Sequence, residues 1–151
     1  MDLTFKLTGA DKIIDKLSKL PDKLQEAAGK RSARRAMAIV RKAAQVAALR
    51  FDDPETPESV KRNVYLQQSR RGSKRIGGVL MRVGILGGAS QKQAAAAKSN
   101  PGGATWYWRF KELGNENEPA EPFLRPALEN NVGAVTDKLI TELNSELDKL
   151  T

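Results

Sequence analysis

Hydrophobic residues recur at helical spacing in three parts of the chain. In residues 13–20 they lie three to four positions apart, which predicts a short helix ended by Pro21. Residues 22–50 contain no proline and are rich in Ala, Lys, Arg and Gln, so they predict one long Ala-rich helix. From Pro122 onward Leu and Val continue at the same spacing, which predicts a long amphipathic C-terminal helix with a weak point at Gly133.

Strand patterns are shorter. Apolar and polar residues alternate over residues 2–8, which predicts a half-buried strand. Residues 60–66 predict a strand, or a helical turn leading into one, and the β-rich, glycine-punctuated residues 76–86 predict another. A hairpin tip is expected between these two, with four positive charges at Arg70, Arg71, Lys74 and Arg75. Strands and helices do not alternate regularly, so we expect an α+β fold in which a small antiparallel sheet packs against the long Ala-rich helix and the C-terminal helix.

The remaining segments are predicted to connect these elements within one domain covering residues 1–151. Residues 51–59 hold two prolines and four acids, a composition that favours a turn over a metal site. Residues 87–105 are of low complexity, so a mobile loop is expected there. Half of the aromatic residues fall within residues 106–110; a core anchor is favoured over a base-stacking platform.

Charge is distributed unevenly along the chain. The formal net charge is +8, and the first hundred residues carry +12 whereas the last fifty-one carry −4. This polarity suits head-to-tail association, in which the basic surface of one copy meets the acidic surface of the next. The alternative is an ordinary surface on which the charges do not segregate in space.

Within the long predicted helix, the basic residues share one face and the small apolar residues fill the other. The apolar arc includes Ala36, Val40, Ala44 and Val46, and we expect it to be buried. The basic face and the hairpin tip are the candidate interfaces; they consist of Arg31, Arg34, Arg35, Arg41 and Lys42, and of Arg70, Arg71, Lys74 and Arg75.

The composition also limits the chemistry. The chain has no Cys and no His, which excludes thiol nucleophiles, Cys/His zinc sites and imidazole catalysis. No glycine-rich phosphate loop and no sheltered carboxylate pair is apparent, so we expect no enzyme activity, no catalytic residues, no cofactor and no bound metal. No apolar run is long enough to cross a bilayer and no signal peptide is evident, so a soluble protein of the cytoplasm with no membrane partner is expected.

The stretch 107–129 resembles the tail-completion, or head–tail joining, proteins of long-tailed double-stranded DNA bacteriophages. The matching residues are Phe110, Glu112, Gly114, Pro122, Phe123, Pro126, Ala127 and Leu128. The chain departs from that family at Pro57, where a glycine would stand, and at Asn115, which replaces a common threonine. Proline in the first turn of a helix, an anchoring phenylalanine and a turn glycine also have a structural explanation, so these residues are expected mainly to make the fold.

The resemblance implies a structural protein of the virion neck, assembled in the cytoplasm of the bacterial host. Such proteins form a ring, for which a hexamer is favoured over a dodecamer, that completes the tail end and joins it to the head. The implied partners are other copies of the chain, the head connector or stopper proteins, the tail terminator or tail tube protein, and DNA passing through the lumen. The net charge alone would also suit a sequence-independent double-stranded DNA-binding protein, which is the alternative interpretation. A third interpretation is an adaptor protein unrelated to phage.

Overall fold

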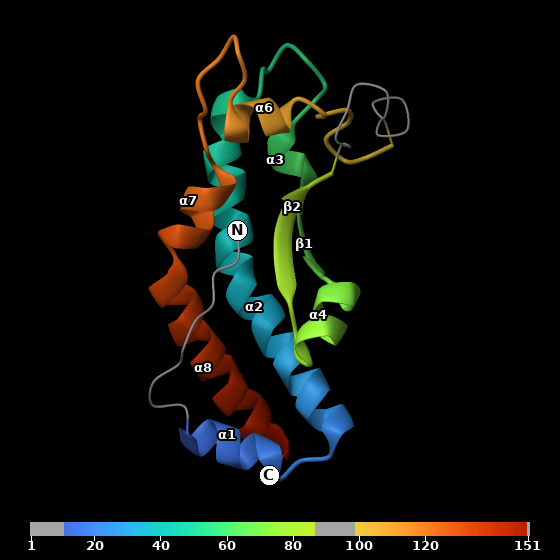
Figure 1. Ribbon diagram of the computed structural model, residues 1–151, viewed down its shortest axis with the longest axis vertical. Coiled ribbons are helices and arrows are strands. Elements are labelled where there is room, and N and C mark those ends of the chain that lie inside the picture. Colours follow the sequence, from blue (N-terminus) through green and yellow to red (C-terminus); the bar gives the residue numbers. More distant parts are fainter. Residues whose placement is uncertain (1–10, 87–98, 151) are drawn as a thin grey trace.

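The computed structural model describes residues 11–86 and 99–150 (Figure 1). The strand predicted for residues 2–8 and most of the predicted 87–105 loop lie outside these ranges. Helix α2 runs along the molecule, with helix α8 on one side of it and a two-stranded sheet on the other (Figure 1). The fold is α+β, as the sequence pattern predicted.

The elements follow one another in this order. Helix α1 spans Asp11–Ser18 and α2 spans Asp22–Ala48, which continues as the 3-10 turn η1, Leu49–Phe51. Helix α3, Val60–Asn63, leads directly into strand β1, Val64–Gln68, and helix α4, Arg70–Ile76, precedes strand β2, Met81–Ile85. The chain then forms helices α6, Trp108–Leu113, α7, Leu124–Glu129, and α8, Val132–Leu150.

Helix α2 is the centre of the packing because it buries a small residue at every fourth position. The buried set is Ala28, Ser32, Ala36, Val40, Ala44 and Ala48. Small side chains on this line let both the sheet and helix α8 approach the helix axis closely. Val46 was expected on the buried face, but its exposed fraction is 61%, because it borders a shallow apolar hollow over Ile39 and Ala47 that no described element fills.

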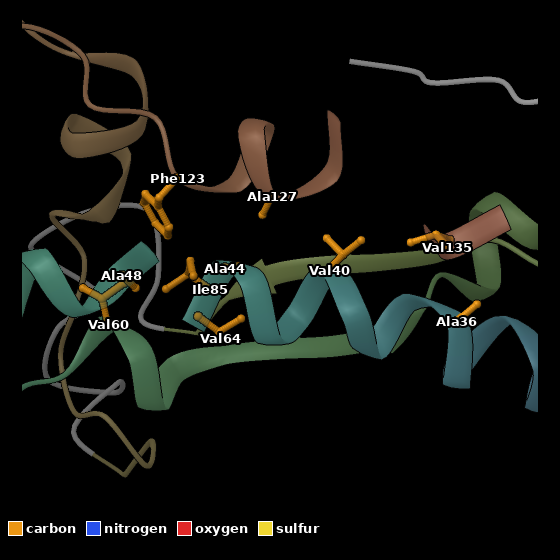
Figure 2. Close-up of a cluster of buried hydrophobic side chains, with 10 residues drawn as sticks. All are labelled: Ala36, Val40, Ala44, Ala48, Val60, Val64, Ile85, Phe123, Ala127 and Val135. Atoms are coloured by element: carbon orange, nitrogen blue, oxygen red, sulfur yellow. The ribbon is translucent and has the colours of Figure 1, made fainter. Parts of the chain in front are cut away.

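Helices α2 and α7 and the sheet share one apolar core (Figure 2). Phe123 is fully buried and points toward the side chains of Ala44 and Ile85 (Figure 2). Its ring meets the ring of Phe51 edge-on, with 5.3 Å between centroids. Phe123 therefore ties the segment before α7 to the end of α2 and to the sheet.

The sheet is antiparallel, and its register pairs Val64 with Ile85 and Gln68 with Met81. Opposite Tyr65 lies Gly84, where a Cβ would come within 2.7 Å of the Tyr65 hydroxyl oxygen. The tyrosine ring therefore covers the glycine, and any side chain at residue 84 would have to displace it.

Residues 70–75 lie in the connection between β1 and β2, where a hairpin tip was predicted, but this connection holds helix α4 and not a tight turn. The Ser69 hydroxyl accepts a hydrogen bond from the Gly72 amide at 3.1 Å and caps the first turn. At the other end Gly77 has a φ of +67°, the left-handed conformation that stops a helix. Of the predicted 76–86 strand, Ile76 ends α4 and residues 77–80 connect the helix to the sheet, so β2 is limited to residues 81–85.

The described end of the predicted mobile loop, residues 99–105, is packed rather than solvated. The Asn63 amide nitrogen donates to the Gly103 carbonyl oxygen at 2.9 Å and to the Thr105 hydroxyl at 2.7 Å. The Gly102 amide donates to the Asn63 side-chain oxygen at 2.7 Å. Because Asn63, Gly102 and Thr105 are all buried, this turn is packed as part of the fold, and the mobility of the loop stays a prediction.

The C-terminal helix is also interrupted earlier than expected. Helix α7 ends at Glu129 and α8 begins at Val132, so the break falls at residues 130–131 and not at Gly133, which lies inside α8. The Asn131 side chain donates to the Ala127 carbonyl oxygen at 2.8 Å, which satisfies one of the carbonyl groups left free by the end of α7. Asparagine side chains compete for backbone groups in this way, which favours a helix end here.

Candidate assembly surfaces

The two halves of the 107–129 motif meet at the carboxylate of Glu112. Its Oε2 atom accepts hydrogen bonds from the amides of Phe123, at 2.7 Å, and Leu124, at 3.0 Å. Its Oε1 atom accepts a third, from the Arg125 amide at 3.0 Å. Glu112 therefore caps the N-terminus of α7 from outside the helix, where a negative charge and free amide donors attract each other.

The other motif residues lie around this cap. Gly114 has a φ of +75°, and a Cβ there would come within 2.7 Å of the backbone nitrogen of Ala120. Pro126 stands in the first turn of α7, where proline is tolerated, and Leu128 packs against the core. Phe110 has an exposed fraction of 42% and lies edge-on against Trp106, with 6.0 Å between ring centroids. Apart from Phe110, these side chains are occupied in holding the chain together.

The aromatic cluster is divided between core and surface. Tyr107 and Trp108 pack against the core cluster, which agrees with the anchoring role favoured by the sequence, whereas Phe110 faces outward. Burial raises the pKa of the Tyr107 hydroxyl, and the nearby carboxylates of Asp52 and Glu58 raise it further. A neutral Tyr107 is therefore favoured at physiological pH.

Two of the five residues of the basic face of α2 form ion pairs with carboxylates of α8. Arg31 donates from Nε to Glu146 Oε2 at 2.9 Å, and a second Arg31 nitrogen lies 2.7 Å from the same oxygen. Arg35 Nη1 lies 2.8 Å from Glu142 Oε2 and 3.1 Å from Glu146 Oε1. We call these four residues the α2–α8 clamp, because they join the two long helices.

The clamp perturbs the titration of its members. The hydrogen bond from Arg31 holds the pKa of Glu146 below its ordinary value, and the one from Arg35 does the same for Glu142. In return Glu142 raises the pKa of Arg35. The Glu146 side chain is only 3% exposed, so its charge depends on these partners. Arg31 and Arg35 are therefore poor candidates for an external interface, whereas Arg34, Arg41 and Lys42 are exposed on α2 and form no ion pair with another described residue.

The basic residues near α4 are arranged differently. Residues 67–82 contain five cations and no carboxylate: Arg70, Arg71, Lys74 and Arg75 from α4, and Arg82 from β2. All five are exposed, and none forms an ion pair with any other described residue. We call them the basic tip. The sequence prediction missed Arg82, although alternation along β2 places it opposite the exposed Gln67, on the outward face of the sheet.

The basic tip is concave on its outer side. A hollow of about 710 Å³ is lined by four of its arginines, all except Lys74, with Gln67, Gln68 and Ser69 between them. We call this hollow the arginine groove. A second hollow of about 780 Å³, on the side facing α2, is shared by Arg70 and Lys74 with Asp22 and Glu26. Carboxylates thus adjoin the inner side of the tip, while no carboxylate lines the arginine groove.

Acidic residues gather at the other end of α2. Segments 52–58 and 112–121 together contain eight carboxylates and no lysine or arginine. These segments adjoin, since Arg50 donates to the carbonyl oxygens of Glu121 and Pro122. Asp52, Glu112 and Glu118 are engaged in internal hydrogen bonds or ion pairs. The exposed carboxylates of Asp53, Glu55, Glu116 and Glu121 form no ion pair with another described residue, and we call them the acidic apex.

The described residues offer little other chemistry. Residues 11–86 and 99–150 contain no group of acids able to hold a metal ion. Within the same ranges, no helix has the length and apolarity that a membrane span requires.

Comparison with known proteins does not assign a family. No protein-family model matches the chain, and no curated protein or solved structure is significantly similar to it.

Proposed function

We propose that this chain is a structural protein of the bacteriophage neck, where copies form a ring that completes the tail end and joins it to the head connector. The partners in this proposal are other copies of the chain, in a hexamer rather than a dodecamer, together with the head connector or stopper proteins and the tail terminator or tail tube protein. Its place is the virion neck, after assembly in the host cytoplasm.

One observation carries the proposal: unpaired charges of opposite sign lie toward opposite ends of helix α2. The arginine groove lies beside α4, which packs near the start of α2, whereas the acidic apex adjoins its end (Figure 1). Helix α2 has 27 residues and is about 40 Å long, so the two surfaces are well separated along it. Such a molecule suits repeated heterologous contacts, which close into a ring when the rotation between neighbours allows it.

The resemblance over residues 107–129 supports the same proposal. The matching residues come from two separate segments, and the Glu112 carboxylate joins them by accepting hydrogen bonds from the start of α7. They therefore form one local unit of the fold, as a shared structural motif would.

Localising the protein in virus particles that contain it tests the proposal. Antibody–gold labelling or electron cryomicroscopy of such particles, and of their isolated tails, should place it as a ring at the end of the tail nearest the head. Particles made without it should accumulate as separate heads and tails. Its absence from mature particles, or normal head–tail joining without it, would contradict the proposal.

The basic tip also favours a second candidate, sequence-independent binding of double-stranded DNA. If the five cations of the tip engaged phosphates, the logarithm of affinity should fall with the logarithm of salt concentration with a slope of about −4.5. A salt titration with random-sequence DNA separates the two functions. A steep slope that is lost when tip residues are neutralised would favour DNA binding, and a shallow slope would favour the neck.

A further inference from the structure

The basic tip and the acidic apex differ in shape as well as in charge. The arginines of the tip surround a hollow of about 710 Å³, whereas segments 52–58 and 114–121 project as loops beyond the end of α2 (Figure 1). A projecting acidic loop and a recessed basic groove are complementary surfaces, and both are present on the same chain.

We infer that the arginine groove of one copy receives the acidic apex of the next copy, in a head-to-tail contact. This inference rests on the proposed function, because it identifies the two surfaces that would repeat around the ring. In this contact Arg71, Arg75 and Arg82 face the carboxylates of Glu55 and Glu116 of the neighbouring copy.

The chemistry of the groove favours carboxylates. A guanidinium group carries donors in a planar fork that matches the two oxygens of a carboxylate. Since no carboxylate lines the groove, the arginines repel one another until an acidic partner arrives.

A second copy explains more of the molecule than nucleic acid does. DNA would neutralise the tip but would leave the acidic apex without a partner. A head-to-tail contact satisfies both surfaces at once, and it leaves one of each free at the ends of an open chain of copies. When this row of copies closes into a ring, the last free groove binds the last free apex.

The natural chain has no cysteine, so single cysteines can report this contact without background. We would place one in the groove, Gln67→Cys, and one at the apex, Asn117→Cys; both residues are exposed and neutral, so the charges stay intact. Equal amounts of the two variants are combined and oxidised, and a dimer that joins one copy of each variant is called a mixed dimer. If copies collided at random, half of all cross-linked dimers would be mixed dimers. A groove–apex contact should raise the mixed fraction well above half at about 50 mM salt and return it to half near 1 M, where the screening length is only about 3 Å.

A matched control uses Thr141→Cys, which is exposed on α8 and lies in neither surface. Paired with either reporter, it should give the random fraction. Adding Arg71→Glu and Arg75→Glu to the groove reporter should abolish the excess of mixed dimers. Because these side chains are exposed and have no ion-pair partner among the described residues, the fold should survive this change.

Three results would overturn the inference. The first is a random distribution of dimers at low salt, and the second is an excess of mixed dimers that the Arg71→Glu, Arg75→Glu pair leaves unchanged. The third is a gel shift in which the natural chain binds DNA and that variant does not, while the cross-linked dimers stay random at every salt concentration. None of them decides whether the protein sits in the neck, which the localisation experiment tests separately.

Discussion

Two groups of arginines that look alike in the sequence have different roles in the structure. Arg31 and Arg35 of α2 reach across to Glu142 and Glu146 of α8, and Glu146 is almost fully buried beneath them. The arginines of the basic tip have no carboxylate within ion-pair distance among the described residues and surround an open groove. The first group belongs to the fold, and the second is available to a partner.

The difference shows that the position of the acids decides what a cluster of cations does. Both groups lie on helices and both are exposed at their tips. A charge contributes little to stability at the surface, but a buried carboxylate that loses its partner destabilises the fold. The same change of charge should therefore destabilise the fold strongly at the clamp and hardly at all at the tip.

The largest effect is expected from reversing the clamp. Arg31→Glu with Arg35→Glu places two new negative charges against Glu142 and the buried Glu146. We expect the melting temperature to fall by on the order of 10 °C. Differential scanning calorimetry or circular dichroism would measure it.

The tip supplies a control with the same change in net charge. Arg71→Glu with Arg75→Glu should alter the melting temperature by no more than about 2 °C, since surface changes cost within about 0.5 kcal/mol. Equal losses in the two variants would mean that the distinction between clamp and tip is wrong.

A smaller loss of stability is expected at low pH. Acid neutralises the clamp carboxylates but, unlike the reversed clamp, places no new negative charge beside them. Because the folded-state pKa values of Glu142 and Glu146 are lowered, their stabilisation is present above the ordinary value of 4.5 and is lost as the pH falls below it. Denaturant unfolding between pH 7 and pH 3 should therefore show a loss of stability that Glu146→Gln makes shallower. A Glu116→Gln variant, which changes an acid of the apex, should keep the slope of the natural chain.

Next in size is the cap that joins the two halves of the motif. Glu112→Ala removes the acceptor of three backbone amides at the start of α7, which should lower the free energy of unfolding by about 1–2 kcal/mol. Urea unfolding monitored by tryptophan fluorescence is suitable, because Trp108 opens the helix that carries Glu112. Glu116→Ala, four residues away and exposed, is the matched control and should change stability by less than about 0.5 kcal/mol.

The smallest effect is expected at the exposed ion pair between Lys111 and Glu118, which are 3.0 Å apart. Both side chains are in contact with solvent, so Lys111→Ala should cost no more than about 0.5 kcal/mol. A loss as large as that of Glu112→Ala would show that exposure is a poor guide to the role of a charge in this molecule.

The sequence allowed prediction of those elements that depend on local composition and spacing. The long helix over residues 22–50 and the antiparallel sheet followed from helix formers, periodicity and β-rich runs, and both are confirmed. Helix α4 and the break at residues 130–131 were missed, because single capping side chains, Ser69 and Asn131, decide them. Short polar side chains of this kind act on the neighbouring backbone and leave no periodic signal.

The candidate surfaces were predictable only in part. The basic tip could be found as a run of cations without acids, although its helical form and Arg82 were missed. The clamp could not be predicted from the sequence. Arg31 and Glu146 are separated by 115 positions, and only the packing of α2 against α8 brings them together. The expectation of one continuous basic interface on α2 consequently included two residues that the fold itself uses.

The most direct test of this pairing is an exchange of charge between the arginine groove and the acidic apex. Both cysteine reporters would carry Arg71→Glu and Arg75→Glu in the groove together with Glu55→Arg and Glu116→Arg at the apex, which keeps the net charge at +8. If the groove of one copy binds the apex of the next, each half of the exchange alone abolishes the excess of mixed dimers and the complete exchange restores it. Dimers that remain random after the complete exchange would contradict the pairing of these two surfaces.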